Sequence, residues 1–185
     1  MENNWFNSRK AAQVAAFFAL QTGGRINLLK AVKLIYLAER KFLGEFEASM
    51  LRDQLVSMDY GPVNSKTLNH INGMALNPDG WREFISDREN YHFSVARPDI
   101  SVASLDELSR AEVRILSETW AEFGGMDQWQ LAEYTHKHCP EWEDPDGSSN
   151  PIPYSRVFKY LNKTNPEELE QKILLERKLE SLLNT

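Results

Sequence analysis

The chain has 185 residues, of which 42% are hydrophobic and 26% are charged, with a formal net charge of −6. This length and apolar content suit one compact domain with or without an appendage, and they exclude wholesale disorder. The acidic balance argues against a nucleic-acid surface as the main role of the protein, because phosphate binding needs clustered Lys and Arg. We therefore expect no nucleic-acid partner.

Cys139 is the single cysteine. No intramolecular disulfide can form, which is typical of a reducing compartment. The apolar run at residues 11–20 is alanine-rich and too short to span a membrane. The N-terminal residues also lack the basic start and the cleavage site of a signal peptide. We expect a cytoplasmic protein that does not associate with membranes.

The first predicted helix begins at Asn7 or Ser8, either of which can cap it, and ends before Gly23-Gly24. Its alanine-rich run lets another helix approach closely, which predicts a packed helix pair.

The second predicted helix follows the cap residue Asn27, ends near Gly44 and carries the strongest apolar pattern in the chain. At 100° per residue its large apolar side chains cluster on one side. Glu39 breaks this pattern, because it projects into the middle of the apolar side. The basic residues are predicted to lie on the opposite side of the helix: Lys30, Lys33, Arg40 and Lys41.

A carboxylate placed like that of Glu39 should be buried only with a partner, and Arg52, Tyr60 and His70 are candidate partners. One interpretation is a buried acid at a functional site. The other is a structural ion pair or a hydrogen-bonded carboxylate, which we favour, because structural networks perturb carboxylates as active sites do.

In the middle of the chain, residues 63–73 are predicted to form a short helix after the Gly-Pro turn. Residues 81–95 change to an alternating pattern, which predicts a small β-hairpin across the polar link at 87–90. Such a hairpin is marginal alone and should lie against the helices.

Two capping-box patterns, at residues 109–112 and 127–130, predict helices that end near Phe123 and at Cys139-Pro140. After a loop, a short helix at 154–161 precedes the last helix. That helix starts at Asn165-Pro166 and places leucines on one side: Leu175, Leu179 and Leu182. The predicted fold is mainly α, a compact helical domain with a small β-hairpin and a C-terminal helix.

The residues that could carry chemistry are isolated. His136, His138 and Cys139 point in different directions from one helix end, and no second His or Cys pair completes a metal site. No serine lies in a glycine elbow, and no phosphate-binding glycine loop is present. We therefore predict no catalytic residues, no metal and no cofactor.

Four segments follow one another around the predicted hairpin: KLIYLAERKFLGEF, LVSMDYGPVNSKTLNHING, LSRAEVRIL and LAEYTHKHCPEWEDPDGSSNPI. The parts at 57–63 and 135–142 are the most specific. In this order and spacing the chain resembles the Panacea domain, the SocA-like antitoxin domain that also occurs in phage-associated proteins. The resemblance covers about residues 7–161, so residues 1–162 are expected to form the domain and residues 163–185 an amphipathic extension.

The resemblance implies an antitoxin of a toxin–antitoxin system, which neutralises a cognate toxin through direct protein binding and uses no cofactor. It also implies that the motif residues are scaffold and contact residues: Tyr60, Gly61, Pro62, His136 and Trp142. Within this framework, Glu39 is expected to tie the central helix to the turn Tyr60-Gly61-Pro62. The partner-binding surface is expected at exposed aromatics such as Trp129 or Trp142, or at the leucines of the last helix, which either folds back or presents that face.

Two alternatives remain at this stage. The protein could be an adaptor that delivers the toxin to a Clp-type protease, as a SocA-like member can. Less favoured is a hydrolase or nuclease-like enzyme that uses Glu39, His70 or His136, which would require these groups to converge in one pocket.

Overall fold

The structure is a computed structural model that describes residues 5–184. The predicted mainly α-helical class is confirmed. The helices are α1 (Ser8–Gln21), α2 (Leu28–Phe46), α3 (Ser65–Ile71), α4 (Asp79–Arg82), α5 (Arg110–Phe123), α6 (Gln128–His138), α7 (Tyr154–Tyr160) and α8 (Pro166–Leu183). The strands are β1 (Arg25–Asn27), β2 (Leu55–Met58), β3 (Gly61–Asn64), β4 (His92–Ser94) and β5 (Asn150–Pro151), and a short 3₁₀ turn lies at Val102–Ser104.

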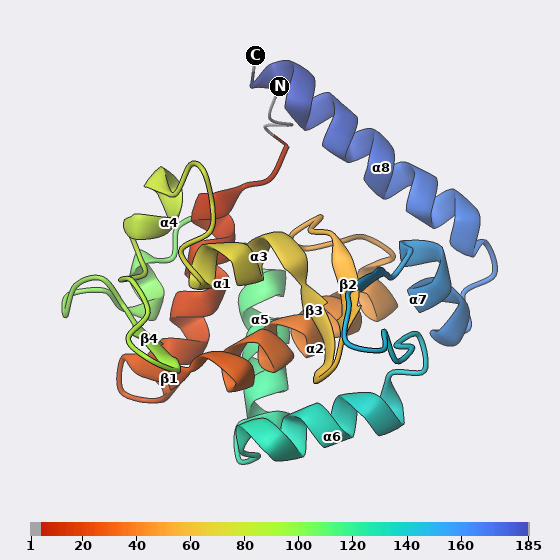
Figure 1. Ribbon diagram of the computed structural model, residues 1–185. Coiled ribbons are helices and arrows are strands. Elements are labelled where there is room, and N and C mark those ends of the chain that lie inside the picture. The colour runs from red at the N-terminus through yellow and green to blue at the C-terminus, as the bar shows by residue number, and fades with distance from the viewer. Residues whose placement is uncertain (1–4, 185) are drawn as a thin grey trace.

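Helix α2 lies in the middle of the fold and packs against α1, α5, α6 and β3 (Figure 1). Because neighbours surround it on nearly every side, residues 31–39 are all buried. The helix continues two residues past Gly44, to Phe46. The predicted solvent-facing position of Lys33 is therefore wrong: its side chain is fully buried.

Helix α1 presents the alanine-rich surface that the sequence predicts. Its alanines have no exposed surface, which lets α1 approach α2, α4 and α5 closely. Asn7 caps the helix by accepting a hydrogen bond from the Lys10 amide, and α1 ends before Gly23 as predicted.

The predicted hairpin at residues 81–95 is only partly correct. The chain reverses there, but the two arms share only the isolated bridges Ile85↔Val95 and Glu89↔His92. Strand β4 instead pairs antiparallel with β1, with Ile26 opposite Phe93. A strand of three residues gains more from this distant partner, because the pair then lies against the helical core.

The regular hairpin lies at β2 and β3, which join antiparallel through the turn at Asp59-Tyr60. Strand β5 pairs with the other edge of β2, so the sheet order is β3-β2-β5. This sheet places the turn directly over helix α6, and β3 and α6 are in contact.

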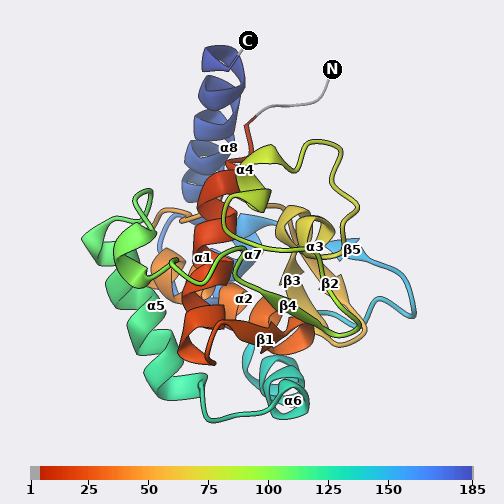
Figure 2. The same ribbon diagram turned by 90° about the vertical axis from the view of Figure 1, so that its left-hand side faces the viewer.

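Helix α8 extends away from the helical body, and in both views its C-terminal end and helix α6 lie at opposite ends of the molecule (Figures 1 and 2). Its first turns pack on the domain through the buried residues Leu169 and Ile173. Within residues 5–184, no helix is long and apolar enough to cross a membrane.

Candidate functional site

Lys33 on helix α2 holds the Gly-Pro turn in place. Its Nζ donates a 2.9 Å hydrogen bond to the carbonyl of Pro62. Gly61 has a φ of +105°, and a Cβ at this position would overlap Thr135 Oγ1 on α6, so the turn requires glycine. Burial lowers the pKa of Lys33 to about 7, because the charged form loses its hydration.

Glu39 is buried, as the apolar pattern predicts, but its expected partner is wrong. The carboxylate accepts hydrogen bonds from the Ser49 hydroxyl and from the amides of Met50 and Leu51, both at 3.1 Å. It therefore ties α2 to residues 49–51 and not to the turn Tyr60-Gly61-Pro62. Burial raises the pKa of Glu39, and the hydrogen bonds from its donors lower it. The net result is a pKa of about 7.

This difference has a local cause. Glu47 follows α2 with a left-handed φ of 52°, which turns the chain back along the helix. The amides of Met50 and Leu51 and the hydroxyl of Ser49 then face the helix, and the buried carboxylate of Glu39 accepts from all three. The side chain of Arg52 instead contacts Glu180 on α8.

Sequence reasoning missed a second buried carboxylate, Glu141. Tyr36 Oη donates to its Oε1 at 2.7 Å, and Arg40 Nε donates to the same oxygen at 2.7 Å. Glu141 has no exposed surface. Tyr36 and Arg40 are one helical turn apart and so share a face of α2, which is the signal that could have indicated a common acceptor. The sequence predicted Arg40 on the polar side of the helix and did not indicate Glu141 as its partner.

His136 and Trp142 lie beside the β2–β3 turn. Their rings stack with centroids 4.1 Å apart, and Trp142 Nε1 donates to the Met58 carbonyl at 2.8 Å. These contacts join α6 and the loop after it to the hairpin. Burial lowers the pKa of His136, and the positive charge of Lys33 lowers it further.

The groups named for an enzymatic mechanism do not converge. Glu39 bonds only to residues 49–51, whereas the ring of His70 packs between Phe6 and Trp81. His136 stacks on Trp142. Within residues 5–184 no three His, Cys, Asp or Glu side chains are grouped to hold a metal ion. The structure therefore offers the hydrolase interpretation no shared pocket.

Cys139 does not act as an activated thiol in this structure. It is buried, and burial together with the nearby Glu141 raises its pKa to about 12. A thiol in such an environment is a poor nucleophile.

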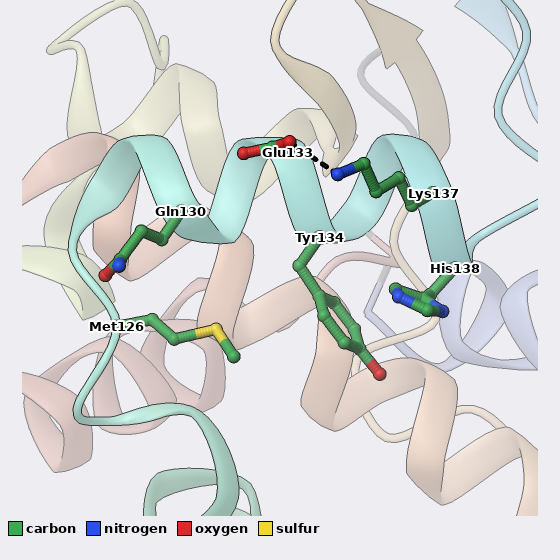
Figure 3. Close-up of a pocket in the computed structure, with 6 residues that line it drawn as sticks. All are labelled: Met126, Gln130, Glu133, Tyr134, Lys137 and His138. Atoms are coloured by element: carbon green, nitrogen blue, oxygen red, sulfur yellow. Dashed lines mark hydrogen bonds and ion pairs between the residues drawn. The ribbon is translucent and has the colours of Figure 1, made fainter.

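A surface depression of about 220 Å³ lies along the outer side of α6 (Figure 3). Glu133 and Lys137 form an ion pair at 2.5 Å on its rim, and the Tyr134 ring stacks on His138 with centroids 4.4 Å apart. The remaining lining residues are Met126 and Gln130. Of its polar groups, Glu133 and Lys137 pair with each other.

Tyr60 and Trp129 form an exposed aromatic pair. Tyr60 comes from the β2–β3 turn and Trp129 from the first turn of α6. Their rings meet edge to face with centroids 5.5 Å apart. Tyr60 is 58% exposed and Trp129 is 56% exposed, which is unusual for large aromatic side chains.

Helix α8 packs one face against the domain and exposes the opposite face to solvent. Leu169, Ile173 and Arg177 face inward, and Arg177 donates to the carbonyls of Arg52 and Asp53. The predicted leucine stripe faces away from the domain, with exposed fractions of 56% for Leu175, 51% for Leu179 and 62% for Leu182. The predicted contact residues are thus exposed, and their part in binding stays a prediction.

Comparison with known proteins yields one family. The model of the family described as "Antitoxin SocA-like, Panacea domain" matches residues 32–143, which is more than half of the chain. This span is narrower than the resemblance at residues 7–161. It begins within α2 and ends just after Trp142, so it contains Lys33, Glu39 and the Gly-Pro turn. No curated protein and no solved structure matches.

Proposed function

Because the chain belongs to the SocA-like antitoxin family of Panacea domains, we propose that it is the antitoxin of a toxin–antitoxin pair and neutralises its toxin through direct protein–protein binding. The family match over residues 32–143 is the observation that carries this proposal. The exposed aromatic and leucine side chains support it, because they offer surface for a protein partner.

Neutralisation by binding requires a sizeable interface. A specific protein–protein contact buries about 1,200–2,000 Å² in total, and its centre is rich in aromatic side chains. The pair Tyr60–Trp129 and the stripe Leu175, Leu179 and Leu182 are two surfaces of the required kind. We also propose that residues 1–162 form the toxin-neutralising domain, that residues 163–185 are an extension, and that the pair acts in the cytoplasm.

The reading frame beside this gene tests the proposal. Expressed alone, its product should stop growth, and co-expression of this protein should restore growth. A catalytically dead toxin variant gives the control for expression burden. The proposal fails if the neighbour is harmless, or if growth stays arrested although this protein accumulates in soluble form.

The same cells separate neutralisation from the adaptor role. An adaptor would deliver the toxin to a Clp-type protease, so the half-life of the toxin should shorten when this protein is present and recover when the protease is deleted. An unchanged half-life together with restored growth supports neutralisation by binding alone.

A further inference from the structure

We propose that the surface around Tyr60 and Trp129 is the docking site for a basic face of the toxin, with an Arg or Lys side chain seated against the two rings. This inference rests on the proposed function and names the surface that performs it. We call this surface the aromatic–acidic patch. It consists of the two aromatic residues and the acidic side chains around them: Asp59, Asp127, Glu133, Glu143, Asp144 and Asp146.

The turn that carries Tyr60 is held by hydrogen bonds on both sides. Trp142 bonds to the Met58 carbonyl on one side of the turn, and Lys33 bonds to the Pro62 carbonyl on the other. The Gly147 amide donates to Asp59 Oδ1 at 3.1 Å, which fixes the following acidic loop to the same turn. A surface that is ordered before binding loses little conformational entropy when a partner arrives.

The charge around the pair is negative. The described segments 57–61, 127–137 and 142–148 contain six carboxylates and a single Lys or Arg residue, Lys137. Lys137 pairs with Glu133, and Arg156 from α7 pairs with Glu143. The other four carboxylates form no ion pair within residues 5–184 and are exposed: Asp59, Asp127, Asp144 and Asp146.

This combination selects a cationic partner. The faces of Trp and Tyr rings attract an Arg or Lys side chain, and surrounding carboxylates attract the same charge and bind guanidinium groups directly. An anionic or nucleic-acid partner would be repelled. The toxin should therefore carry a cluster of Arg and Lys on the face that it uses here.

By the criterion of charge complementarity, the leucine stripe on α8 is a weaker candidate for the docking site. The charges beside it have both signs, for example Lys172, Glu176 and Lys178, so it is complementary to no particular charge. It also lies toward the opposite end of the molecule from α6 (Figures 1 and 2). A toxin docked at the patch would leave the stripe uncovered unless it spanned the whole domain.

The test is calorimetric titration of the full-length protein with the purified product of the adjoining reading frame. Trp129→Ala should weaken binding by about 30-fold or more, the loss typical of a binding hot spot. The triple variant Asp59→Asn, Asp144→Asn and Asp146→Asn keeps one side-chain oxygen acceptor at each position but removes three charges. It should weaken binding by about 10-fold at low salt and by less at high salt, because salt screens exposed charges.

Three controls make the outcomes separable. The triple variant Asp79→Asn, Asp87→Asn and Asp99→Asn removes as many exposed charges outside the patch and should bind like the wild type. Unfolding midpoints show that each variant is folded. The double variant Leu175→Ala and Leu179→Ala tests the other surface.

The patch is overturned if both patch variants bind like the wild type, or if only the α8 variant is weakened. A wild-type protein that does not bind the toxin at all contradicts the proposed function instead.

Discussion

The buried polar residues of α2 and the aromatic–acidic patch contain similar chemical groups in opposite settings. Lys33 and Glu39 are buried and Arg40 is partly buried, and each bonds to a different segment of the chain. The acids of the patch are exposed and mostly without a cationic partner. Groups with strongly shifted pKa values often mark active sites, but here every one of those three on α2 already has an internal partner. The shifted pKa values on α2 therefore mark structural contacts, and the exposed carboxylates belong to the surface that we propose binds the toxin.

The largest expected effect follows from breaking the Arg40–Glu141 pair. Arg40→Met keeps the apolar stem but leaves the carboxylate of Glu141 buried with only the Tyr36 hydroxyl. The free energy of unfolding should fall by about 3–5 kcal/mol, the usual loss when one partner of a buried pair is removed. Denaturant titration measures it.

The matched control is Arg114→Met, because Arg114 pairs with Glu45 and Glu118 through side chains that are all at least 40% exposed. It should leave the free energy of unfolding almost unchanged, because solvent screens exposed ion pairs. Equal losses for the two variants would contradict the assignment of Arg40 to a buried framework.

Lys33→Met should change how stability depends on pH above neutrality. The pKa of Lys33 is lowered from 10.5 to about 7 in the fold, so above pH 7 the unfolded chain holds a proton that the folded chain has released. Stability therefore rises with pH from 7 toward 10.5, by at most about 1.4 kcal/mol per pH unit. Unfolding curves at pH 7, 8 and 9 should show this rise in the wild type and its loss in the variant. If the unfolding free energies of the wild type and the variant changed with pH in parallel, this prediction would be refuted.

Glu39→Gln should change how stability depends on pH below neutrality, over a narrower pH range than Lys33→Met does above it. The pKa of Glu39 is raised from 4.5 to about 7, so between these values the folded chain holds a proton that the unfolded chain has lost. The contribution is fully present below pH 4.5 and is lost as the pH rises through 7. Unfolding free energies at pH 5 and 7 should differ less in the variant than in the wild type. Some difference should remain, because burial also raises the pKa of Asp53.

Trp129→Ala should have the smallest effect on stability. The ring is 56% exposed and its edge-to-face contact with Tyr60 is worth about 0.5–1.5 kcal/mol. The unfolding free energy should fall by about that amount while the affinity for the toxin falls by about 30-fold or more. A loss of several kcal/mol on thermal or denaturant unfolding would place Trp129 in the framework instead of the patch.

The positions of most helices could be predicted from the sequence, because helix starts are decided locally. The cap residues Asn7, Asn27, Ser109 and Asp127 each accept the amide hydrogen bonds that their patterns indicate. Stop signals worked for the same reason, with Gly124 following α5 as the predicted closing residue.

The strand pairs and the buried polar contacts could not be predicted in the same way, because their partners are distant in the chain. Strand β1 pairs with β4, and Arg40 meets Glu141 about a hundred residues further on. Periodicity also misplaced Lys33, because a helix that is covered on nearly every side has no single solvent-facing side. Exposure of Trp129 was predicted correctly, whereas Trp142 is half-buried and Tyr60 was assigned only to the motif.

Amide hydrogen exchange with and without the toxin tests the contrast between framework and patch most directly. The account predicts that toxin binding slows exchange in residues 57–61 and 128–138, while exchange within α2 and at residues 174–183 stays unchanged. Slower exchange confined to residues 174–183, with none at the β2–β3 turn or α6, would contradict it.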